Sequence, residues 1–165
     1  MVAELRANAT GTDRWVLLAY RLPREPSTPR IAVWRRLRRL GVGQLLDGLV
    51  TLPLDARNRE QLEWVADAVV ESGGLATIWI GRPTSRLDER GIVTEMASAV
   101  AAEYRGVIRD AAAARGAEAA ARRRTLRRLR RELHRIRQRD YFPPPEAEQA
   151  RRVVEGLAAL EEVPT

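Results

Sequence analysis

The chain has 165 residues, 45% of them hydrophobic, and a formal net charge of +7. This length allows one domain, or a compact core with an extension, and the apolar content is enough to build a buried core. Having no cysteine and one histidine, His134, the chain excludes disulfide frameworks, thiolate or multi-histidine metal sites and a cysteine nucleophile. No apolar run reaches the roughly 18 residues of a membrane span, and residues 1–13 lack a signal-peptide core. We therefore expect a cytoplasmic protein without a cofactor.

The first half predicts alternating strands and helices after a flexible N-terminal tail at residues 1–13. Apolar runs at 15–23 and 75–83, each ending in proline, have the length of buried strands. Between them, residues 43–54 predict one bent strand or a tight pair of strands that turn at Asp47 and Gly48.

Two helices are expected between these strands. Thr28 before Pro29 predicts the N-cap of the first, and Gly41 its end. Asp55 or Asn58 is expected to cap the second, which ends near Gly73. The predicted inward positions are Ile31, Val33, Trp34, Leu37 and Leu40 in the first helix, and Leu62, Val65, Val69 and Val70 in the second. The order β-α-β(β)-α-β predicts an α+β fold, a ferredoxin-like sheet with two covering helices in residues 14–84.

Residues 85–165 predict a helical C-terminal extension. Apolar residues at helical spacing cover about 88–115, and a break is expected around Gly116. A second helix runs to about Asp140, where proline residues end it, and a short final helix follows from about Ala150. The second helix has a narrow apolar seam, Leu126, Leu129, Leu133 and Ile136, that must pack against a partner.

The basic charge is concentrated in residues 122–139. This segment has ten arginines and one acid, Glu132, a balance of +9 within a chain of +7, so that the remainder sums to −2. Concentrated guanidinium groups on one rod are typical of a polyanion-binding surface. We predict that this helix contacts the phosphates of double-stranded DNA. The predicted DNA-binding residues are Arg122, Arg123, Arg124, Arg127, Arg128, Arg130, Arg131 and Arg135.

The alternative interpretation of this helix is a solvated face whose charge is offset within the protein. Like charges four residues apart, such as Arg127 and Arg131, destabilise an isolated helix. The acids of the preceding helical segment, Glu95, Glu103, Asp110 and Glu118, could offset them. Four carboxylates cannot neutralise ten guanidinium groups, so the count favours a surplus.

Other patterns carry weaker predictions. Arg24, Thr28 and Arg30 around a helix start form a candidate oxyanion-binding site, for which a simple helix cap is the alternative. His134 is expected on the surface, and the four tryptophans, Trp15, Trp34, Trp64 and Trp79, are expected in or beside the core. Without a catalytic triad, phosphate loop or carboxylate pair at a strand end, we expect a protein that is not an enzyme.

The segments WVLLAYRLPREPSTPRIAVWRRLRRLG, LLDGLVTLP and LRRLRRELHRIRQRDYFPPPEAEQA resemble the N-terminal domain of ChrB-type chromate-resistance proteins. The resemblance covers about residues 15–160. It implies a bacterial, chromate-responsive transcriptional regulator that acts on promoter DNA, with the chromate oxyanion as its effector. The motif positions that match are Glu25, Thr28, Arg30, Trp34, Arg35 and Gly41 in the first block, and Arg135, Arg139, Asp140, Phe142 and Pro143 in the last.

Two departures and one further likeness accompany this resemblance. ChrB proteins commonly have a second domain, which this sequence is expected to lack, and residues 111–124 are richer in alanine than the linker expected there. The first half is also similar to the ferredoxin-like modules of phenylacetate-type repressors and of small CRISPR adaptation nucleases. Those nucleases hold a metal with an aspartate at the end of strand one, where this chain has Arg21, so nuclease activity is not expected.

The alternative function is a protein-interaction or dimerisation module of the chromate-resistance pathway that does not bind DNA. In that case the basic helix would pair with an acidic partner, or a homodimer would form through the apolar seam of residues 126–136.

Overall fold

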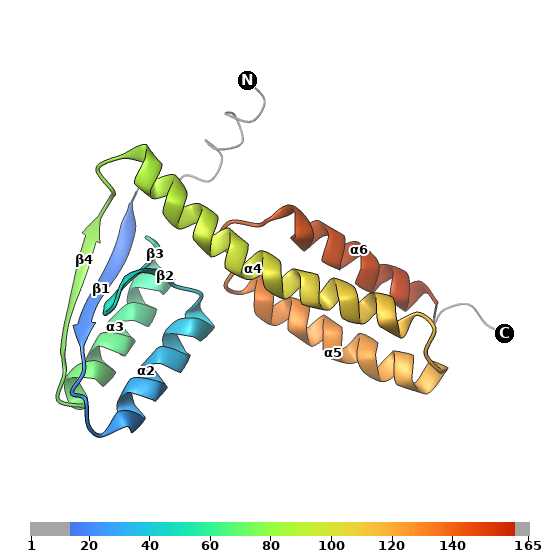
Figure 1. Ribbon diagram of the computed structural model, residues 1–165, viewed down its shortest axis with the longest axis horizontal. Coiled ribbons are helices and arrows are strands. Elements are labelled where there is room, and N and C mark those ends of the chain that lie inside the picture. Colours follow the sequence, from blue (N-terminus) through green and yellow to red (C-terminus); the bar gives the residue numbers. More distant parts are fainter. Residues whose placement is uncertain (1–13, 161–165) are drawn as a thin grey trace. The chain divides into compact units, whose positions relative to one another are not determined.

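The computed structural model describes residues 14–160 (Figure 1). The predicted tail at residues 1–13 lies outside the described residues. The chain divides into two compact units, one up to Thr94 and the other from Glu95 onward, and the division falls within a helix. We call them unit 1 and unit 2 and describe each by itself.

Unit 1 contains a four-stranded antiparallel sheet with two helices. Its elements in order are β1 (Trp15–Arg21), α2 (Ser27–Leu40), β2 (Gly43–Leu46), β3 (Leu49–Pro53), α3 (Ala56–Glu71) and β4 (Leu75–Gly81). The strand order is β2-β3-β1-β4 with every neighbouring pair antiparallel, and α2 and α3 lie on the same side of the sheet (Figure 1). This is the order of a ferredoxin-like sheet, so the predicted α+β class is confirmed.

The core of unit 1 lies between the sheet and its two helices. Val16 and Leu18 of β1 are opposite Leu52 and Val50 of β3, and all four side chains are fully buried. From the helices, the core receives Val33, Leu37, Leu62, Val65 and Val69. Burial of this apolar surface at about 25 cal/mol per Å² stabilises the layered arrangement.

The predicted tight pair of strands is present as β2 and β3. Gly48 has a φ of 78°, which a residue with a side chain rarely adopts, and a Cβ there would lie 2.4 Å from the carbonyl oxygen of Tyr20. Glycine therefore allows the turn to approach β1 closely enough for the Tyr20 N–H to donate to the Gly48 carbonyl at 2.7 Å.

The helix ends in unit 1 correct one sequence prediction. Thr28 is not the N-cap of α2, because the helix begins at Ser27 after Pro26 and has no side-chain cap hydrogen bond. Asp55 caps α3 as predicted, and its carboxylate accepts from the Asn58 N–H at 2.6 Å. Gly41, with a φ of 73°, ends α2 as predicted.

Several large side chains that the sequence predicted to be buried in unit 1 are exposed in the structure. Trp15 is buried, but Trp34, Trp64 and Trp79 are 51%, 48% and 60% exposed, so the prediction of tryptophan in the core holds only for Trp15. Ile31 and Val70, also predicted to point inward, are exposed. Each lies beside the buried stripe of its helix, at a position that helical periodicity alone does not distinguish from the core.

Unit 2 is a three-helix arrangement. It contains the later part of α4 (Arg86–Ala114) with α5 (Ala119–Arg137) and α6 (Pro145–Ala159). The break between α4 and α5 falls at Gly116 as predicted, whereas the last helix begins earlier than expected, because Pro145 occupies its first turn.

The predicted apolar seam of α5 packs inside unit 2. Leu126, Leu129 and Ile136 are buried in one cluster, and Leu133 is partly buried against it. The other buried members of this cluster are Val100, Tyr104, Val107, Ala111 and Ala114 of α4, and Ala150, Val154 and Leu157 of α6. The seam is therefore occupied by the chain's own helices, and it is not an open surface for dimerisation.

Within residues 14–160, no helix combines the length and the apolar character that crossing a membrane requires.

Candidate nucleic-acid interface

Helix α5 presents most of its arginines to solvent because its apolar stripe is buried on the opposite side. Arg122 is half-buried, and the exposed arginines among the predicted DNA-binding residues are Arg123, Arg124, Arg127, Arg128, Arg130, Arg131 and Arg135. The structure thus places all eight predicted residues on one rigid rod, with seven of them accessible.

Part of this charge is offset by acids of unit 2, as the alternative interpretation anticipated. Arg128 lies 2.8 Å from the Asp110 carboxylate of α4 and 3.7 Å from Glu132. Arg139, just after α5, pairs with Glu103 of α4. Asp110 and Glu103 belong to the set of acids proposed from the sequence, so acids of α4 do offset part of the charge.

The compensation is incomplete. Glu118 caps α5 by accepting from the Ala120 N–H at 3.1 Å, and this hydrogen bond, followed by the charges of nearby arginines, lowers the pKa of its carboxyl group. Among the residues the structure describes, six arginines of α5 have no carboxylate within 4.0 Å: Arg124, Arg127, Arg130, Arg131, Arg135 and Arg137. A surplus of guanidinium groups therefore remains for an external anion.

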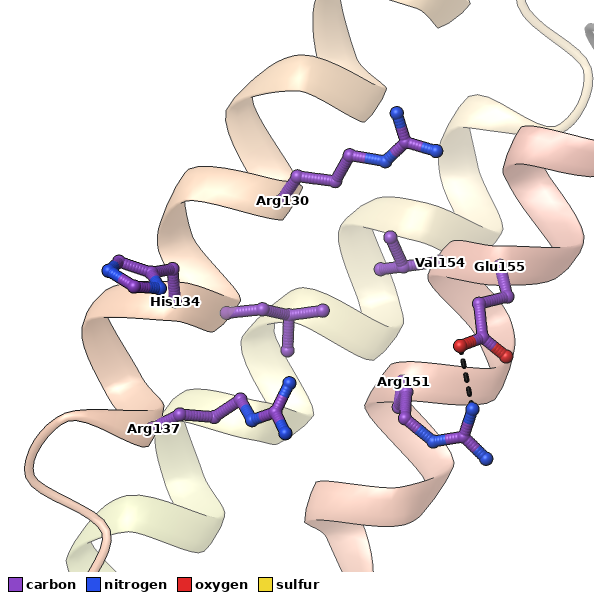
Figure 2. Close-up of a pocket in the computed structure, with 7 residues that line it drawn as sticks. Arg130, His134, Arg137, Arg151, Val154 and Glu155 are labelled. Carbon is purple, nitrogen blue, oxygen red and sulfur yellow. Dashed lines mark hydrogen bonds and ion pairs between the residues drawn. The ribbon is translucent and has the colours of Figure 1, made fainter.

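A hollow of about 420 Å³ lies between α5 and α6 (Figure 2). Arg130 and Arg137 of α5 point towards α6 across it, whereas the ring of His134 points away. Leu133 and Val154 line it with apolar surface. Sequence reasoning identified Arg130 but not Arg137, and the seven-residue spacing of the two, about two helical turns, is the signal that places them on one side.

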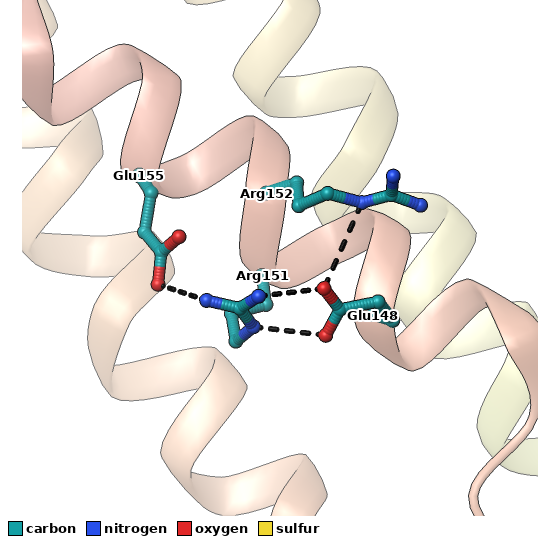
Figure 3. Close-up of polar contacts among 4 residues, drawn as sticks. All are labelled: Glu148, Arg151, Arg152 and Glu155. Carbon is teal, nitrogen blue, oxygen red and sulfur yellow. Dashed lines mark hydrogen bonds and ion pairs between the residues drawn. The ribbon is translucent and has the colours of Figure 1, made fainter.

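The α6 wall of this hollow has its own ion pairs (Figure 3). Arg151 donates to both carboxylate oxygens of Glu148, at 2.9 and 2.6 Å, and to Glu155 at 2.6 Å. Arg152 lies 3.8 Å from Glu148. The wall therefore presents satisfied charges of both signs, and only the α5 side offers unpaired guanidinium groups. The sequence signal was the spacing of three and four residues around Arg151.

A polar contact holds the C-terminal end of α5 against α4. The Tyr104 hydroxyl donates to Asp140 at 2.8 Å. Burial, and then this hydrogen bond, raise the pKa of the tyrosine, and burial raises the pKa of the Asp140 carboxyl. The contact therefore orients the end of the basic helix.

The predicted oxyanion residues lie in unit 1, at the start of α2. Arg24, Thr28 and Arg30 are all exposed, and none has a hydrogen bond or ion pair to another residue of the described chain. The absence of a side-chain cap on α2 leaves backbone N–H groups of its first turn open. Their binding of an oxyanion stays a prediction.

The structure thus defines a class: a ferredoxin-like module joined to a helical unit with a surplus of arginine on one exposed helix. The chain matches the family described as "Protein ChrB, N-terminal" over residues 30–163, most of its length. It belongs to this family of regulators associated with chromate resistance. The resemblance found in the sequence is confirmed.

Comparison with other proteins adds the fold alone. Among curated proteins, no match is found. The solved structure of "Uncharacterized protein Rv0674 from Mycobacterium tuberculosis" is similar, with a TM-score of 0.53 and 16% sequence identity over 97% of this chain and 68% of that one.

Proposed function

We propose that this protein is a non-enzymatic, chromate-responsive transcriptional regulator that binds double-stranded promoter DNA through α5. One observation carries the proposal: exposed arginines of α5, among them Arg127, Arg131 and Arg135, have no carboxylate within 4.0 Å among the described residues. Family membership supplies the biological context, chromate resistance.

The physical basis of binding is the release of counterions from DNA. Each phosphate that an arginine neutralises contributes about 0.9 to the slope of log affinity against log salt. Guanidinium groups held on a helix need little further ordering, because the buried stripe at Leu126, Leu129 and Ile136 fixes the rod.

The test is the double variant Arg127→Glu/Arg131→Glu, measured by fluorescence anisotropy with DNA from upstream of the chromate-resistance genes at several salt concentrations. We expect affinity to fall at least a hundredfold and the salt slope to decrease by about 2. The matched control is Arg109→Glu/Arg115→Glu, which makes the same charge change in the same unit on two exposed arginines, one in α4 and one directly after its end. If both double variants bind equally well, α5 is not the interface.

The response to chromate forms the second part of the proposal, with Arg24, Thr28 and Arg30 as the effector residues. An effector shifts DNA affinity only through a difference in its own affinity for the two states. We expect Arg24→Ala/Arg30→Ala to remove the effect of chromate on DNA binding while leaving affinity without chromate unchanged. A full chromate response in this variant would show that chromate binds at another site.

The protein-interaction module remains the second candidate, in a narrower form. Since the seam of α5 is buried within unit 2, dimerisation would need another surface. No affinity for DNA at low salt, together with a homodimer or a stable complex with an acidic protein in light scattering, would favour it.

A further inference from the structure

Helix α2 of unit 1 is a second basic rod, and its charge is less compensated than that of α5. It has five arginines and no acid in 14 residues. They are Arg30, Arg35, Arg36, Arg38 and Arg39. None of them has a carboxylate within 4.0 Å in the part of the chain that the structure describes, and only Arg36 is partly buried.

Two exposed tryptophans accompany this charge. Trp34 of α2 is 51% exposed, and the guanidinium carbon of Arg38 lies 5.0 Å from its ring centroid. Trp64 of α3 is 48% exposed, and Arg36 reaches across from α2 to 5.9 Å from its ring. These cation–π contacts orient the rings, while about half of each side chain stays in solvent.

We define the α2 surface by Trp34, Arg35, Arg38 and Arg39. Its contacts give it two chemical capacities at once. The guanidinium groups without a carboxylate partner can bind phosphates, and the oriented indole ring of Trp34 offers a flat aromatic face at low cost in side-chain entropy.

This combination fits one ligand class. In duplex DNA the base faces are stacked and unavailable to an indole ring, whereas unpaired bases expose them. The carboxylates of an acidic peptide would satisfy the arginines, but they provide no partner for an aromatic face. We propose that the α2 surface binds single-stranded nucleic acid, with arginines on the backbone and Trp34 stacked against a base.

This inference does not depend on the proposed function, because it uses other residues, another unit and another ligand. From the sequence, Trp34 was predicted to lie on the inward side of its helix, and the arginines of the α2 surface were assigned no ligand. The exposure of Trp34 and Trp64 is what changes that interpretation.

The experiment uses the full chain with fluorescein-labelled oligonucleotides of 15 deoxyuridines or 15 uridines, which differ only in the sugar, at about 50 and 200 mM salt. We expect salt-sensitive binding measured by anisotropy, with quenching of tryptophan fluorescence. Trp34→Ala should weaken binding about tenfold, the loss expected for one stacked base. Arg38→Glu/Arg39→Glu should weaken it further and lower the salt slope. Equal affinity for the two oligomers would indicate stacking without sugar recognition, and a preference for one would identify DNA or RNA as the ligand.

Two controls isolate the surface. Trp79→Ala removes a tryptophan that is 60% exposed on β4 and has no guanidinium over its ring in the described residues. Arg86→Glu/Arg90→Glu reverses two exposed arginines at the start of α4, within unit 1. We expect both variants to bind single strands within about twofold of the parent chain.

Three results would overturn the proposal: no binding of either oligonucleotide at low salt, equal effects of Trp34→Ala and Trp79→Ala, or tighter binding of poly-glutamate than of both oligomers. The last would mark an acidic protein as the partner. The α5 variant Arg127→Glu/Arg131→Glu separates the two proposals, since it should lose duplex binding and keep single-strand binding.

Discussion

The two arginine-rich helices, α2 and α5, differ in the groups that surround their positive charges. Helix α5 packs against two neighbouring helices through its buried stripe and pairs Arg128 with Asp110 of α4, while Arg139, just after α5, pairs with Glu103. Helix α2 has no acidic residue, and two of its five guanidinium groups lie over aromatic rings instead. A surplus of arginine therefore does not define a single kind of surface, and the neighbours of each guanidinium group decide which anion it suits.

The largest expected difference between the two helices comes from truncating one large side chain in each and comparing the loss of stability. Leu129 of α5 is fully buried, so Leu129→Ala should lower the free energy of unfolding by about 2–5 kcal/mol. Trp34 is half exposed, and Trp34→Ala should cost roughly 1 kcal/mol or less despite removing a larger side chain. Urea unfolding followed by circular dichroism measures both.

The control for the α5 variant is Leu160→Ala at the end of α6, which truncates a leucine that is partly exposed. It should change stability by less than about 1 kcal/mol. A cost for Trp34→Ala as large as that for Leu129→Ala would show that Trp34 supports the fold, and it would remove the reason to expect a ligand there.

The starts of the helices sharpen the comparison at a smaller scale. Asp55 caps α3 with a 2.6 Å hydrogen bond, whereas α2 begins without a side-chain cap. Asp55→Ala should therefore destabilise the protein by about 1 kcal/mol, and Thr28→Ala should have almost no effect. Thermal unfolding of the two variants checks the difference, and equal losses would restore Thr28 as a cap.

Much of the fold followed from local patterns. The strand lengths, the Asp47–Gly48 turn and the seam of α5 are set by short-range periodicity and by backbone preferences, which the sequence displays directly. The prediction of Thr28 as the N-cap of α2 was wrong. Pro26, Ser27 and Thr28 all permit a helix start, and the packing of the preceding loop decides among them.

Only part of the candidate interface could be predicted from the sequence. That α5 is basic is visible in the sequence, but which arginines are free depends on how α4 lies beside α5, and that placed Asp110 against Arg128. The exposure of Trp34 was hidden for a related reason. A tryptophan beside an apolar stripe has the same spacing whether it points into the core or out to solvent, and only tertiary packing separates the two.

The smallest expected effect concerns the contact that fixes the end of α5, the hydrogen bond from Tyr104 to Asp140. The folded state raises the pKa of Tyr104 above its ordinary value of 10.0, so the folded chain keeps a proton that the unfolded chain loses. The stability from this group is complete below pH 10 and declines as the pH rises further. Thermal unfolding between pH 8 and 11 should therefore show a shallower decline for Tyr104→Phe than for the parent chain. Part of the decline should persist in that variant, because burial also raises the pKa of Tyr20. Parallel curves for the two proteins would mean that the pKa of Tyr104 is the same in the folded and unfolded states, and that its hydrogen bond to Asp140 does not stabilise the end of α5.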